Sequence, residues 1–166
     1  EKARDLAQND YRYWANLAEM YALIPEKRDA ARGVFQRAIE LAEQQRTRDP
    51  GNVALLNRLA NCYAYLNEPD RASALIEQAL QTAPGDVQLR FGAAKVFSTI
   101  GSIPRGIEML EQALRGGYSF EEALTSEPLE PLRIRPSAVP RRLPGTVTPV
   151  RFPSQSSFRP CIPAVW

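Results

Sequence analysis

The chain has 166 residues, of which 44% are hydrophobic and 24% charged, and these are ordinary values for a soluble domain. It contains no histidine, which removes the commonest general base, the triads built on it and most zinc sites. All 19 acidic residues lie at or before Glu130, so the first 136 residues carry a net charge of about −2 and offer no electrostatic footprint for nucleic acid.

Motifs for catalysis and for nucleotide or metal binding are missing from the sequence. No glycine-rich phosphate loop is present, and neither HRD nor DFG marks a kinase domain. Cys62 and Cys161 stand far apart, without the paired spacing of a zinc site or a disulfide framework. Carboxylate pairs such as Glu40 with Glu43 are expected to be solvated. We therefore expect a chain that is not an enzyme and that needs neither a cofactor nor a metal.

No membrane or export signal is visible in the sequence. No apolar run approaches the ~18 to 20 residues needed to cross a bilayer, and no signal-peptide pattern opens the chain. We expect no membrane association. The sequence does not fix the cellular compartment of the protein, although the cytoplasm is favoured.

Helical periodicity begins at Tyr11, after residues 1–10, which look like the end of a truncated preceding repeat. Residues 11–52 predict a hairpin of two helices around a turn at Pro25. Its second helix runs about seven residues, or roughly two turns, beyond the regular length. It ends before Asn52, which is suited to cap the next helix. The expected core residues are Trp14, Leu17, Ala18, Tyr21, Ala31, Phe35 and Ala38.

The most regular hairpin is predicted over residues 53–86, with its turn at the Asn67-Glu68-Pro69-Asp70 break. Apolar and small residues recur at spacings of three and four on both sides of that break. Its expected core residues are Leu56, Leu59, Ala60, Tyr63, Ala72, Ile76 and Ala79.

A third hairpin is predicted over residues 87–118, with Ala93, Ala94, Phe97, Leu110 and Ala113 in its core. Arg90 stands at a position that is usually apolar, and Gly106 lies inside a predicted helix, where glycine costs roughly 1 kcal/mol relative to alanine. We expect this hairpin to be the least stable. Ser119 and Glu122 have the spacing of a capping box, which predicts a short closing helix over residues 119–126.

The length of the 53–86 unit and the order of its small and large residues resemble a tetratricopeptide repeat. The resemblance implies an all-α fold, a right-handed superhelical stack of antiparallel helical hairpins over residues 11–136. The phrase GYSFEEALTSEPLEPLR is similar to the segment that closes the tetratricopeptide arrays of many bacterial serine/threonine protein kinases. The elongated second helix is similar to those arrays too, and the likeness ends at Pro136.

In such arrays the concave face, lined mainly by the first helix of each hairpin, binds the partner. Asn57 and Asn61 lie one turn apart, so their amides could hold the backbone of an extended peptide while Tyr65 and Phe91 contact its side chains. An alternative is that these are merely exposed polar residues. The groove positions that the resemblance implies are Arg12, Ala15, Asn16, Glu19 and Leu23, then Asn57, Arg58, Asn61 and Tyr65, then Gln88, Phe91, Lys95 and Thr99.

Two functions follow as expectations. The first is a noncatalytic protein interaction module that binds a peptide or a helix in the groove. The alternative is the regulatory or sensory segment of a bacterial serine/threonine protein kinase whose catalytic domain lies outside this chain. Self-association through the first hairpin is also expected, because a stack without a preceding hairpin leaves Tyr13, Trp14 and Leu17 poorly protected.

Residues 137–166 contain six prolines and four arginines but no acidic residue and no periodicity. Such a segment buries too little apolar surface to offset its ordering entropy, so a disordered tail is predicted. Its prolines could form a proline-rich ligand motif. The loss of acids where the family likeness stops is also what a shifted reading frame would give.

Overall fold

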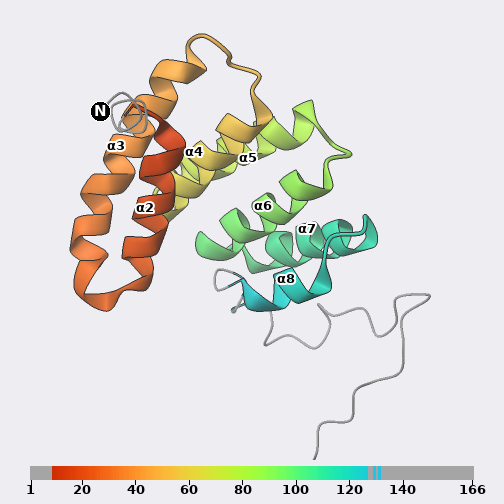
Figure 1. Cartoon of the computed structure of the whole chain (residues 1–166). Coiled ribbons are helices and arrows are strands. Elements are labelled where there is room, and N and C mark those ends of the chain that lie inside the picture. Colours follow the sequence, from red (N-terminus) through yellow and green to blue (C-terminus); the bar gives the residue numbers. More distant parts are fainter. Residues whose placement is uncertain (1–8, 127–128, 130, 132–166) are drawn as a thin grey trace, which may run out of the picture.

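The computed structural model describes residues 9–126, Leu129 and Pro131, and within them the chain folds into α-helices and one 3₁₀ turn, without strands. Consecutive helices pair as hairpins, α2 with α3, α4 with α5 and α6 with α7, and the hairpins stack side by side (Figure 1). This is the predicted helical solenoid. The elements are α2 (Tyr11–Leu23), η1 (Pro25–Lys27), α3 (Arg28–Arg46), α4 (Val53–Tyr65), α5 (Pro69–Thr82), α6 (Val87–Thr99), α7 (Ile103–Arg115) and α8 (Phe120–Thr125).

The first helix of each hairpin starts at a side-chain cap, which fixes where it begins. Asp10, Asn52 and Asp86 each accept a hydrogen bond from a backbone N–H in the first turn, at 2.9 to 3.0 Å. Ser119 caps α8 in the same way, at 3.3 Å. Each bond satisfies a backbone donor that the helix itself leaves unpaired. The structure therefore confirms the predicted caps at Asn52 and Ser119.

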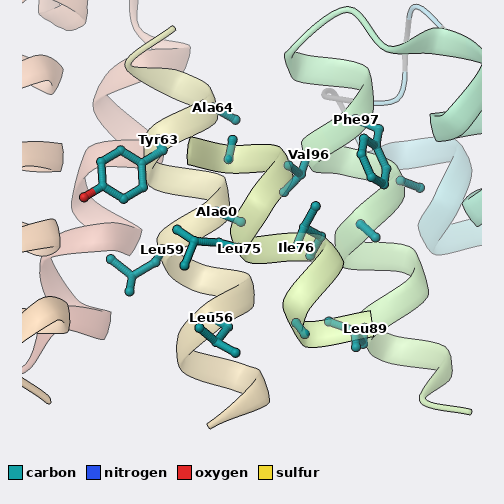
Figure 2. Close-up of a cluster of buried hydrophobic side chains, with 14 of the residues drawn as sticks. Leu56, Leu59, Ala60, Tyr63, Ala64, Leu75, Ile76, Leu89, Val96 and Phe97 are labelled. Atoms are coloured by element: carbon teal, nitrogen blue, oxygen red, sulfur yellow. The ribbon is translucent and has the colours of Figure 1, made fainter. Parts of the chain in front are cut away.

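The buried residues form two clusters, and the larger one extends from α2 to Leu129 and contains the core of the central hairpin (Figure 2). Alanines such as Ala60 and Ala72, both fully buried, let the paired helices approach closely, while Leu59 and Ile76 fill the space beside them. The residues predicted from periodicity for the second and third hairpins are all less than 10% exposed. In the first hairpin Ala18, Ala31, Phe35 and Ala38 are buried, whereas Trp14, Leu17 and Tyr21 are half-buried.

The elongation of the first hairpin's second helix is confirmed. Helix α3 has 19 residues, compared with 14 in α5 and 13 in α7. Its added turns carry Leu41 and Ala42, which are buried in the core cluster that includes α4. The Tyr63 hydroxyl donates to the Glu43 carboxylate at 3.3 Å. The extension of α3 therefore packs against the central hairpin through apolar contacts and one hydrogen bond.

The C-terminal end of the stack is closed by the short segment that follows α7. Gly117 has a φ of 95°, a backbone conformation that strains other residues, and it turns the chain toward α8. Ala123 and Leu129 are 6% and 1% exposed and belong to the main core cluster. The Tyr118 ring stacks on Phe91 with centroids 3.9 Å apart. These contacts cover the apolar side of the last hairpin.

Ser98 in α6 carries a hydroxyl for which the described part of the chain supplies no hydrogen-bond partner, although the residue is only 4% exposed. The same repeat position holds Ala64 in the preceding hairpin. We expect Ser98→Ala to raise the free energy of unfolding by about 1 kcal/mol, because it removes a buried unpaired group. Urea titration would measure this. Ser73→Ala is the control, since its hydroxyl donates to the Asp70 carbonyl at 3.1 Å and its loss should not stabilise. Destabilisation by Ser98→Ala would contradict the expectation.

Three expectations, one about the weakest hairpin and two about the ends of the chain, remain predictions. Arg90 donates from its guanidinium to the Pro84 carbonyl, and Gly106 is buried within α7, but neither contact measures the stability of the third hairpin. The predicted tail over residues 137–166 lies outside the described residues, as does most of the predicted repeat end at 1–10. No helix in the described part is both long enough and apolar enough to cross a membrane.

Candidate functional site

A hollow of about 660 Å³ opens between α4 and α6, the first helices of the second and third hairpins. These two helices lie next to each other in the stack (Figure 1). Side chains three and four residues apart face the hollow from each helix, while the opposite sides of the same helices are buried in the core. The predicted groove residues that line it are Asn57, Arg58, Asn61, Gln88, Phe91 and Lys95.

One wall of the hollow is fixed by a polar network that joins the first hairpin to the second. Glu19 on α2 accepts hydrogen bonds from Arg58 at 2.9 Å and from the Asn61 amide nitrogen at 2.7 Å. The ion pair compensates the charge of Arg58. Glu19 therefore supports the site through its neighbours, although it does not itself line the hollow.

Asn61 is only 7% exposed, and its amide oxygen finds no hydrogen-bond partner among the described residues. The orientation of the amide follows from Glu19, because exchanging oxygen and nitrogen would set two acceptors against each other. A buried acceptor without a donor costs about 1 to 3 kcal/mol. The wall of the hollow therefore contains a buried hydrogen-bond acceptor, the Asn61 amide oxygen, for which the described residues supply no donor.

The amide of Asn57 packs against the backbone of Gly92 on the next hairpin. A Cβ on Gly92 would lie 2.6 Å from both the amide nitrogen and the amide oxygen of Asn57, too close for any real contact. Glycine at this position therefore lets the two helices hold Asn57 in place. Gly92 was not predicted as a site residue, yet a glycine inside a helix usually has a packing or functional reason.

Replacing Gly92 with alanine tests this contact. Alanine favours a helix over glycine by about 1 kcal/mol, and here that gain should be offset by the displacement of Asn57. Gly33→Ala is the matched control, because Gly33 also lies within a helix and its Cβ would meet nothing within 4 Å. We expect Gly33→Ala to stabilise by about 1 kcal/mol and Gly92→Ala to gain clearly less. Equal gains in urea titrations would contradict the packing role.

Phe91 and Lys95 supply an apolar and a charged contact on α6. Phe91 is half-buried, and its stacking on Tyr118 at an interplanar angle of 13° holds the ring in one orientation. Burial, together with the neighbouring carboxylate of Glu122, raises the pKa of the Tyr118 phenol, which stays neutral. Lys95 forms no ion pair with any described residue, so its charge is available to a ligand.

Several predicted groove residues lie away from this hollow. Arg12 is paired with Asp10 at 2.8 Å, and Asn16 is exposed on α2. Tyr65 stacks on Phe35 with centroids 4.9 Å apart and lines a separate hollow of about 580 Å³. Ala15 is fully buried in the core of the first hairpin, so its assignment to the groove is wrong.

Leu23 and Thr99 are the remaining predicted groove residues, and the hollow has further lining residues besides the predicted ones. Leu23 is 53% exposed at the end of α2, and the hydroxyl of Thr99 donates to the Lys95 carbonyl within α6. The hollow is also lined by residues that were not predicted for the groove: Asn52, Val53, Ala54, Asp86, Leu89 and Gly92. Across the described residues, no cluster of three potential metal ligands occurs.

Comparison with known families identifies the class of the central part. Residues 29–90 match the family model described as tetratricopeptide repeat. The match covers α3, α4 and α5 and ends in α6, so it includes the whole central hairpin. A search of curated proteins finds no match. The family match therefore shows that the central part of the chain is similar to tetratricopeptide repeats, and the stacked helical hairpins fit that architecture. Tetratricopeptide repeats generally serve as noncatalytic modules for binding other proteins.

Proposed function

We propose that the chain binds an extended peptide segment of a partner protein in the hollow between α4 and α6. The observation that carries the proposal is the gathering of amide, apolar and cationic side chains from two consecutive hairpins around one hollow. An extended peptide offers backbone donors and acceptors along its whole length, and these are unpaired unless a partner binds them. Asn57 and Gln88 are placed to bind such groups.

The same hollow suggests a preference among peptide side chains. Phe91 presents a fixed ring to an apolar side chain, and the uncompensated Lys95 attracts a carboxylate. Because the Glu19 network and the Gly92 contact already hold Arg58 and Asn57, little side-chain ordering is needed on binding. We therefore propose peptides that carry an acidic residue next to an apolar one.

A peptide library displayed against the full chain tests the proposal. Selected peptides should bind less tightly to Asn57→Ala, Gln88→Ala and Lys95→Ala by about 1 kcal/mol or more each, as measured by calorimetry. Gln81→Ala on α5 is the control, because Gln81 is exposed and does not line the hollow. Unchanged affinity in all three groove variants would reject the site. The Lys95→Ala effect should also shrink at high salt.

A second candidate function is the regulatory or sensory segment of a bacterial serine/threonine protein kinase. It is favoured by the likeness of the GYSFEEALTSEPLEPLR segment, whose Tyr118 packs on the groove residue Phe91 and whose Ser119 caps α8. The genomic sequence upstream of the codon for Glu1 tests it. A kinase domain with HRD and DFG motifs in the same frame would support it, and an unrelated domain there would reject it.

A further inference from the structure

A second hollow lies at the junction of the first two hairpins, apart from the proposed peptide site. It has a volume of about 580 Å³ and is bordered by the end of α2, the start of α3 and the end of α4. Pockets that bind small molecules commonly have volumes of about 300 to 1,000 Å³. We refer to this hollow as the junction hollow, and its lining residues are Ala22, Arg28, Asp29, Ala31, Arg32, Phe35, Tyr65 and Leu66.

The junction hollow is enclosed by two hairpins that the structure describes. In a stack of helical hairpins, each hairpin packs against its neighbours on opposite sides. The junction hollow lies on the side of the first hairpin that faces the second, because Tyr65 and Leu66 at the end of α4 form part of its lining. A hairpin in front of α2 would pack on the other side. The hollow is therefore a feature of this junction and not of the end of the stack.

Aromatic rings and small apolar side chains form the inner part of the junction hollow. Phe35 and Tyr65 stack with ring centroids 4.9 Å apart and an interplanar angle of 16°. Phe35 is 2% exposed and Ala31 3%, so these two are the least exposed of the lining residues. The stacked rings join α3 to α4 and hold each other in one orientation. A flat apolar group can pack against such a wall without the cost of ordering it first.

Two arginines of the junction hollow carry charge that no described residue compensates. Arg28 and Arg32 are four residues apart on α3, so they lie on the same side of the helix. Both are exposed, and neither forms an ion pair with any residue that the structure describes. Asp29 lines the hollow as well. Two positive charges and one negative charge leave a surplus of one positive charge, which matches a single carboxylate.

The corresponding places at the junction of the second and third hairpins are occupied differently. We aligned the second helices of the hairpins on Ala31 and Ala72, and the first helices on Tyr63 and Phe97. In this alignment neither the arginines nor the aromatic residues of the junction hollow recur. The stacking of hairpins therefore requires neither the charges nor the rings at these positions. The counterparts of Arg28, Arg32, Phe35 and Tyr65 are Pro69, Ser73, Ile76 and Thr99.

We propose that the junction hollow binds a small aromatic carboxylate. The flat ring of the ligand packs against Tyr65 and the apolar residues beside it, and its carboxylate accepts hydrogen bonds from the guanidinium groups of Arg28 and Arg32. A guanidinium presents paired donors that match the two oxygens of a carboxylate, and such charge-assisted hydrogen bonds are stronger than neutral ones. The ligand contacts α3 and α4 together, so it links the first hairpin to the second. The proposal does not rest on peptide binding in the hollow between α4 and α6.

Calorimetric titration of the full chain with 2-naphthoate tests the proposal. The unmodified chain should bind 2-naphthoate, and the double variant Arg28→Gln with Arg32→Gln should bind it about tenfold or more less tightly. Arg37→Gln is the matched control, because Arg37 lies on the same helix but pairs with Glu40 at 2.9 Å and does not line the junction hollow. This control should keep the affinity of the unmodified chain. Circular dichroism would show that each variant keeps its helices.

Two further titrations separate the ring from the charge and locate the ligand. The corresponding alcohol, which has the same ring system without a charge, should bind more weakly than 2-naphthoate. Absence of 2-naphthoate binding at millimolar concentration overturns the proposal, as does equal affinity of the double arginine variant or of the alcohol. Binding that Lys95→Gln abolishes and the double arginine variant retains would place the ligand between α4 and α6, and it would overturn the proposal as well.

Discussion

Replacing Leu59 with alanine is expected to lower the free energy of unfolding by about 2 to 5 kcal/mol. Leu59 is fully buried at the centre of the stack, between the helices of the second hairpin and the extended α3 (Figure 2). Truncation removes apolar contacts and leaves a cavity that the rigid neighbours only partly fill. Urea titration followed by circular dichroism measures the loss.

The control for this substitution is Leu23→Ala. Leu23 has the same side chain on a helix of the same stack but is 53% exposed, so its truncation should change stability by no more than about 0.5 kcal/mol. Equal effects of the two substitutions would mean that the central hairpin is not the core of the fold.

The chain is expected to lose stability in alkaline solution because of Cys62. Burial raises the pKa of this thiol from 9.0 to about 12. Above pH 9 the thiol ionises in the unfolded chain but stays protonated in the native one, so the native state binds more protons and stability falls as the pH rises. The contribution is about 1.4 kcal/mol per pH unit between these two values, and it is fully retained below pH 9.

This pH dependence is measured by comparing the chain with its Cys62→Ala variant, both carrying Cys161→Ser. Burial also raises the pKa of Tyr11 and Tyr63, but these phenols are present in both proteins and contribute equally. The free energy of unfolding should therefore fall more steeply between pH 8 and pH 11 when Cys62 is present. Parallel curves would show that the thiol ionises as readily in the folded chain as in the unfolded one.

Much of the fold could be predicted because the same order of small and large apolar residues recurs in successive hairpins of the sequence. The alternation of small and large residues around Ala60 and Ala72 fixes how close the two helices of a hairpin come, and Asn52 and Ser119 fix where helices start. The extension of α3 was visible because its apolar residues continue past the regular length. These signals are local, so each can be read from one stretch of sequence.

The candidate site was less accessible to sequence reasoning, because it depends on how hairpins pack against each other. Periodicity places Asn61 and Tyr65 on neighbouring turns, but it does not show that one is buried beside Glu19 and the other stacks on Phe35. The close approach of Asn57 to Gly92 is likewise set by the geometry between two hairpins. Only the unusual glycine inside a helix hinted at it.

The central claim, that the hollow between α4 and α6 receives a peptide, is tested most directly by mapping where a bound peptide lies. A selected peptide carrying a photoreactive residue would be cross-linked to the full chain, and the attachment sites identified by mass spectrometry. The account predicts cross-links to α4 and α6, at Asn57, Gln88 or Lys95 and their immediate neighbours. Cross-links confined to α2 or to residues 137–166 would contradict it.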